Sequence, residues 1–106
     1  MGLTEKRKLF FDLRKTCEIL VKNHAYKDYP ERGFSKAEII NLVRKGIGNF
    51  RDNNSAEAIE GSYLFFVQDE LERECKLVIL IEEVEVAGES GPEKKMIIVC
   101  SAYRDV

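Results

Sequence analysis

The sequence predicts an α+β domain in which N-terminal helices, one long and one or two shorter, pack on an antiparallel meander sheet of three to four strands. In the first half, apolar residues recur at three- and four-residue steps, which is the period of a helix. In the second half, apolar runs alternate with short polar connectors, which favour antiparallel neighbours. The 106 residues, 44% of them hydrophobic, fit a single domain over residues 1–106 with one core.

The first expected element is a long helix over residues 4–23. Phe10, Leu13 and Cys17 lie on one helical stripe that ends near His24. Thr4 is the expected N-cap of this helix. A short helical turn is expected next, because Pro30 disfavours helical backbone at the residue before it.

A second helix is expected after Ser35. Ser35 and Glu38 have the spacing of a capping box, and Phe34 can pack back onto the helix as a hydrophobic staple. Apolar residues follow at helical spacing, and Gly46 ends the pattern.

Strands are expected over residues 62–68, 76–86 and 95–103, with a further strand near 48–51, near 56–60, or at both. A turn rich in glycine and proline is expected over residues 87–93.

The centres of the three clearest strands are apolar at consecutive positions, so both faces of the sheet carry apolar side chains. Burial of each large apolar side chain is worth about 1.5–3 kcal/mol, so a second face left in water is unfavourable. We therefore expect either the first helix or a second subunit to cover it, and we predict a homodimer through this second sheet face.

Composition and cysteine spacing limit the classes of function. A charged fraction of 34% and short apolar runs disfavour a membrane protein. No basic segment leads into an apolar stretch with a cleavage site, so we expect a cytoplasmic protein. Cys17, Cys75 and Cys100 lack the spacing of a zinc knuckle or a redox dithiol. We expect them to be small buried side chains, with a reactive thiolate as the minor alternative.

The charge is polarised along the chain. Residues 1–52 carry a net charge of +5 and residues 53–106 carry −7, which gives the total of −2. The basic half can form a patch for an anionic partner such as RNA. Lysine-rich helix faces in contact with water are the alternative, and the sequence leaves both open.

His24 is the only histidine, and histidine is the side chain whose unperturbed charge changes near neutral pH. Arg32 follows eight residues later, and arginine binds phosphate through two parallel hydrogen bonds. A lone histidine is more often a packing or capping residue than a catalyst, so the residues alone leave both interpretations open.

A resemblance adds to these residues. Residues 22–25 read KNHA and residues 31–39 read ERGFSKAEI, which resembles the HA…RGIS..EI signature of a small bacterial family of unknown function. Its members carry a four-stranded meander and often end in a strand similar to VCSAY at 99–103. The resemblance covers residues 19–104 and leaves 1–18 as a helical extension. The family is distantly similar to BrnT- and RelE-type toxin domains, which are ribonucleases with helices packed on an antiparallel sheet.

The resemblance implies a metal-independent RNA-cleaving or RNA-binding protein with no cofactor, and RNA or a cognate antitoxin-like protein as its partner. It marks His24, Arg32 and Tyr103 as catalytic, with His24 as acid or base and Tyr103 as a proton donor or a stacking ring. Residues with substrate-binding roles are Arg104, Ser101 and Lys27.

This chain departs from the family pattern at Asp28, where members commonly have an arginine. An acid at this position disfavours RNA binding, as does the net charge of −2. We therefore expect a domain that has lost part of its basic site. The alternative is a non-enzymatic protein-interaction or regulatory module.

Overall fold

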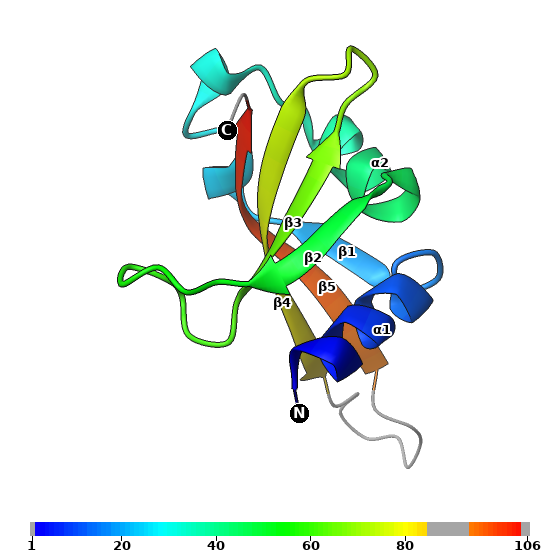
Figure 1. Ribbon diagram of the computed structural model, residues 1–106. Coiled ribbons are helices and arrows are strands. Elements are labelled where there is room, and N and C mark those ends of the chain that lie inside the picture. The colour runs from blue at the N-terminus through cyan, green and yellow to red at the C-terminus, as the bar shows by residue number, and fades with distance from the viewer. Residues whose placement is uncertain (1, 85–93, 105–106) are drawn as a thin grey trace.

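A five-stranded mixed sheet with strand order β1-β5-β4-β3-β2 forms the centre of the computed structural model, which describes residues 2–84 and 94–104 (Figure 1). In chain order, the elements are α1 (Leu3–Leu13), β1 (Glu18–Val21), the 3-10 turns η1 (Asn23–Ala25) and η2 (Pro30–Arg32), α2 (Lys36–Lys45), β2 (Gly48–Asp52), β3 (Tyr63–Gln68), β4 (Glu74–Val84) and β5 (Lys94–Arg104). The α+β class is confirmed. The predicted order of helices before strands is wrong, because β1 precedes α2.

The long helix predicted over residues 4–23 is wrong in its second half. α1 ends at Leu13, and Glu18–Val21 pairs with β5 as a parallel strand. Arg44 of α2 holds the intervening turn by donating to the carbonyl oxygens of Arg14 and Lys15 at 3.1 and 3.2 Å. Because this pairing and these contacts are tertiary, the helical period of the sequence could not reveal them.

The beginning of α1 also differs from expectation, since Gly2 and not Thr4 is its N-cap. α2 begins as predicted, with the Ser35 hydroxyl accepting a hydrogen bond from the Glu38 backbone N–H at 3.1 Å. It ends at Gly46, where a Cβ atom would collide with the Leu42 carbonyl oxygen and the Val67 side chain.

Strands β2 to β5 form the predicted antiparallel meander, with the parallel strand β1 added at its edge. β2 occupies the earlier of the two positions left open, and residues 56–60 belong to the β2–β3 loop. The turn predicted over 87–93 and the last two residues of the strand predicted over 76–86 lie outside the described residues. Within the described part of the chain, no helix has both the length and the apolar character to cross a membrane.

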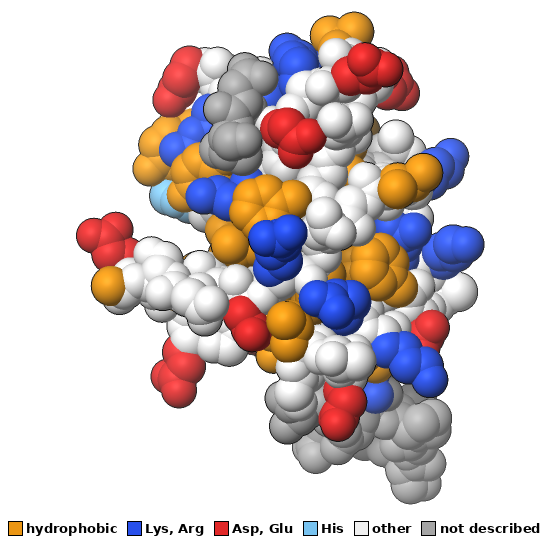
Figure 2. Space-filling view, viewed as in Figure 1, with side chains coloured by type: hydrophobic (Ala, Val, Ile, Leu, Met, Phe, Trp, Pro, Cys, Tyr) orange, Lys and Arg blue, Asp and Glu red, His pale blue; other side chains and the backbone are white. Residues whose placement is uncertain are grey.

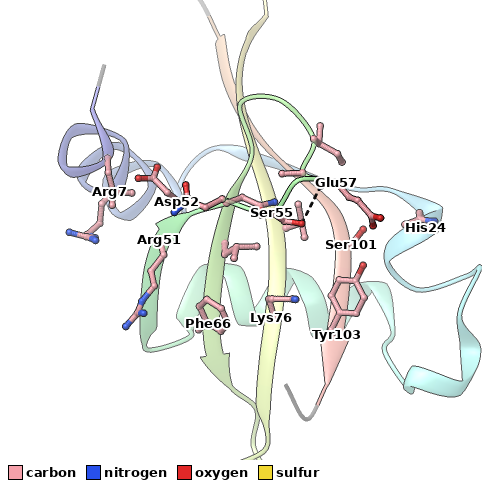
Figure 3. A pocket seen from close by; sticks show the side chains of 17 residues that line it. Arg7, His24, Arg51, Asp52, Ser55, Glu57, Phe66, Lys76, Ser101 and Tyr103 are labelled. Carbon is pink, nitrogen blue, oxygen red and sulfur yellow. Dashed lines mark hydrogen bonds between the residues drawn. The ribbon is translucent and has the colours of Figure 1, made fainter.

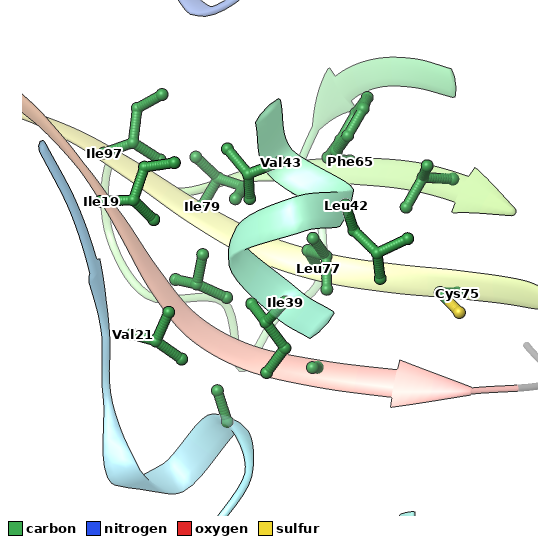
Figure 4. Packing of buried hydrophobic residues seen from close by; sticks show 14 of the residues in the cluster. Ile19, Val21, Ile39, Leu42, Val43, Phe65, Cys75, Leu77, Ile79 and Ile97 are labelled. Carbon is green, nitrogen blue, oxygen red and sulfur yellow. The ribbon is translucent and has the colours of Figure 1, made fainter. Parts of the chain in front are cut away.

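Both faces of the sheet carry buried apolar side chains, as predicted. The larger cluster lies under α1 and α2, where Ile39 and Val43 of α2 pack on Leu77, Ile79 and other residues of the sheet (Figure 4). The smaller cluster on the second face centres on Val78, Ile98 and Cys100. α2 covers only the first face, which is turned away from the viewer in Figure 3. We therefore call the second face the open face.

A β-bulge in β5 decides which of its side chains reach each face. Val78 pairs with Ser101 and Ile79 pairs with Val99, so Cys100 is the extra residue. Side chains normally alternate between faces, but here Cys100 and Ser101 both belong to the open face. After the bulge, Tyr103 lies on the open face and Arg104 on the helical face.

The cysteines largely match expectation, because Cys75 and Cys100 are buried and Cys17 is partly buried. Burial raises the pKa of all three thiols above the ordinary value. All three are free.

Candidate functional site

An open cavity of about 960 Å³ lies on the open face of the sheet (Figure 3). Its floor is made by Leu64 and Phe66 of β3, Lys76 and Val78 of β4, and Ser101 and Tyr103 of β5. The rim carries Arg7 of α1, Arg51 and Asp52 of β2, and His24 of η1, and the β2–β3 loop forms one wall. The cavity is therefore built by all parts of the sheet except β1.

The wall loop is held by its own hydrogen bonds. The buried Ser62 hydroxyl donates to the Ile59 carbonyl oxygen at 2.6 Å and accepts from the Asn53 side-chain amide at 3.0 Å. The Glu57 backbone N–H bonds to the Ser55 hydroxyl at 3.3 Å, near the cavity mouth (Figure 3). These bonds lie within the β2–β3 loop, and none of them involves a residue of the cavity floor.

The cavity carries three cationic side chains, Arg7, Arg51 and Lys76. Within residues 2–84 and 94–104, no ion pair joins Arg7, Arg51 or Lys76 to an acidic side chain. The Arg7 guanidinium donates to the Phe50 carbonyl oxygen at 3.1 Å, which fixes it at the β2 edge. Asp52 and Glu57 also line the cavity and reduce its net positive charge without cancelling it.

Aromatic and cationic side chains alternate in a row that crosses the strands of the open face. Phe66, Lys76 and Tyr103 are cross-strand neighbours on β3, β4 and β5. The Lys76 ammonium lies 4.7 Å from the Tyr103 ring centroid, and the Arg32 guanidinium carbon lies 4.3 Å from the same centroid. We call these residues and Tyr29, whose ring centroid is 3.8 Å from the Arg32 guanidinium carbon, the cation–aromatic row.

His24 lies at the end of this row. Its ring meets the Tyr29 ring edge-on, with 4.9 Å between centroids. Its Nδ1 lies 3.6 Å from an Asp28 carboxylate oxygen, and about half of each side chain is exposed. In Figure 2, the pale blue His24 lies beside hydrophobic and basic side chains that alternate on the surface. The Asp28 carboxylate thus lies directly beside the imidazole.

The structure brings together most of the residues that the sequence marked. His24, Ser101 and Tyr103 line one cavity, and Arg32 contacts the Tyr103 ring. Lys27 is exposed but is not part of the cavity lining. Arg104 lies on the opposite face of the sheet, where it pairs with Asp69 and Glu38. The alternation of side chains along a strand separates Arg104 from Tyr103. Since neither Arg104 nor Lys27 lines the cavity, we leave both out of the site.

Sequence reasoning missed Phe66, Lys76, Arg7 and Arg51. Lys76 did carry a signal, since it is a charged residue between the apolar Cys75 and Leu77 and so faces away from them. The others carry no such signal, because only the strand register and the position of α1 bring them to the cavity.

No family model, no curated protein and no solved structure matches this chain. Within the part of the chain that the structure describes, no three His, Cys, Asp or Glu side chains form a group that could hold a metal ion. The function is therefore inferred from the geometry of the cavity.

Proposed function

We propose that this chain is a toxin-like α+β domain that binds RNA in the cavity of the open sheet face and cleaves it there without a metal ion. One observation supports this most strongly. His24, Ser101 and Tyr103 line the same cavity as three cations that lack carboxylate partners in the described structure. Basic grooves with aromatic side chains are typical of proteins that bind single-stranded nucleic acid.

The chemistry needs a base, an acid and a cation. The base removes the proton of a ribose 2′-hydroxyl, and the oxygen then attacks the adjacent phosphorus. The bond from phosphorus to the 5′ oxygen breaks, the acid protonates that oxygen, and a 2′,3′-cyclic phosphate is left. The accessible His24 imidazole can serve as base or acid, with the Tyr103 hydroxyl as its counterpart. Lys76 supplies positive charge for the transition state.

RNA cleavage in the presence of a metal chelator tests the proposal. We expect the wild-type chain to release fragments that end in a 2′,3′-cyclic phosphate. His24→Ala should lower the cleavage rate by roughly 100-fold or more, because it removes a proton-transfer group. Lys36→Ala is the control, since Lys36 is exposed on α2, which covers the sheet face opposite the cavity. Equal rates for wild type and His24→Ala would contradict the catalytic part of the proposal.

A protein-interaction module is the second candidate, and one observation favours it. Leu80 and Met96 pack at the margin of the smaller apolar cluster and stay partly exposed on the open face. An antitoxin-like protein or a second copy of the chain could cover them. A protein that neither binds nor cleaves RNA would leave this second candidate in place.

A further inference from the structure

We infer that a single strand of RNA crosses the β-strands of the open face, with one unpaired base stacked on Phe66 and a phosphate held beside the Tyr103 hydroxyl. This inference rests on the proposed function and assigns positions within the same cavity. Of the two roles expected for Tyr103, proton donor or stacking ring, the inference keeps only the first.

The Tyr103 ring is enclosed by cations. Lys76 approaches it from β4, the strand on one side of β5. Arg32 donates to the Ala102 carbonyl oxygen at 3.2 Å and so approaches from the other edge of β5, the edge that faces the His24 segment (Figure 3). Because the two cations approach from opposite edges of β5, we expect neither side of the ring to be free for a base. The hydroxyl remains the accessible part of this side chain.

The Phe66 ring is free to accept a base. It is partly exposed and lines the cavity, and in the described structure no aromatic ring or cation stacks on it. Every base presents a π face, so such a ring binds single strands with little sequence preference. A base that is paired in a duplex cannot reach it, which makes unpaired RNA the favoured ligand class.

Lys76 lies between Phe66 and Tyr103, and its ammonium group is the cation that we expect to bind the phosphate. It is the cross-strand neighbour of both Phe66 and Tyr103, and it has no carboxylate partner among the described residues. A phosphate beside the Tyr103 hydroxyl can contact the Lys76 ammonium and the Ser101 hydroxyl, which lines the same floor. Phe66 and Tyr103 are two strand spacings apart, about 10 Å. We expect a dinucleotide to be the shortest ligand that fills both positions.

Binding of two matched strands by fluorescence anisotropy separates base from phosphate contacts. One is a labelled 2′-O-methyl single strand of about 12 nucleotides, which cannot be cleaved through its 2′ oxygen. The other has the same backbone and length without bases. Phe66→Leu should weaken binding of the base-bearing strand roughly 5- to 100-fold. It should change binding of the base-free strand by about twofold or less. Tyr103→Phe, which keeps the ring, should weaken both strands by a similar factor of about 3 to 10.

Leu71→Ala is the control, since Leu71 is 72% exposed in the β3–β4 turn, and thermal melting of each variant checks its fold. The inference is overturned if Phe66→Leu affects both strands alike while Tyr103→Leu removes the preference for bases. It is also overturned if wild type binds both strands equally, although RNA binding itself would then stand. A wild type that binds neither strand would contradict the proposed function and this inference together.

Discussion

Arg104 and Asp69 form the most buried charged pair in the described structure. Arg104 contacts Asp69 through Nη1, lies 2.7 Å from the Glu38 carboxylate through Nη2, and stacks on the Phe34 ring at 4.0 Å. Its Nε donates to the Arg32 carbonyl oxygen at 3.2 Å. One side chain therefore ties the end of β5, the β3–β4 turn and the start of α2 to the segment that presents Arg32 to Tyr103.

Asp69→Asn should make the stability of the protein less dependent on pH. Burial alone would raise the pKa of Asp69, but hydrogen bonds from the Arg73 and Leu71 backbone and from the Arg73 and Arg104 side chains outweigh it and lower the pKa. A carboxylate whose pKa is lower in the folded state stabilises the fold above its unfolded-state pKa. That stability is lost as pH falls through the folded-state value.

Urea midpoints measured from pH 7 down to pH 2 check this prediction. Wild type should exceed Asp69→Asn at neutral pH, and the gap should shrink below about pH 4, the ordinary range of an aspartate. Asp12→Asn, on the exposed side of α1, should leave the midpoint nearly unchanged at neutral pH. A gap that stays constant across the range would contradict the assignment.

At the scale of elements, what could be predicted depends on whether a local signal decided the structure. α2 was predicted because its capping box and its apolar period are both local. β1 was missed because Ile19 and Val21, which face the core, also fit a helical stripe. Its pairing with β5 joins residues that are far apart in the sequence, as do the contacts of Arg44 that end α1.

The N-cap of α2 gives a prediction at this scale. Ser35→Ala removes the acceptor for the Glu38 backbone N–H and should lower the free energy of unfolding by about 1 kcal/mol. Thr4→Ala is the matched control, since the Thr4 side chain caps no helix and its loss should cost about 0.5 kcal/mol or less. Urea denaturation measures both. An equal loss in the two variants would contradict the capping role.

At the scale of the whole molecule, the sheet has one face for the core and one for the site. The sequence marked three residues of the cavity, His24, Ser101 and Tyr103, through a short resemblance. It could not mark Phe66 or Arg51, because their place beside those residues follows from strand register. The charge imbalance along the chain indicated only part of the site, because Arg7 and Arg51 belong to the basic half whereas Lys76 belongs to the acidic half.

The homodimer through the open face stays a prediction, and the structure makes its test specific. Val78, Ile98 and Cys100 are already buried within one chain, so Leu20, Leu80 and Met96 are apolar side chains of the open face that a partner would cover. Light scattering at micromolar concentration should give the mass of two chains for wild type and of one chain for Met96→Asp. A wild-type mass of one chain would contradict the dimer without contradicting RNA binding, because neither Leu80 nor Met96 lines the cavity.

The β-bulge at Cys100 has a consequence for how such a site can change in evolution. If β5 kept all its residues but lost the bulge, its last residues would slip by one position against β4, and Tyr103 and Arg104 would exchange faces. The arginine would then face the cavity, and the tyrosine would meet Asp69 among the core side chains. Deleting Cys100 would have no such effect, because the shortened strand would alternate regularly with Tyr103 still on the open face. The phenol therefore faces the cavity as long as β5 either keeps the bulge or loses its extra residue.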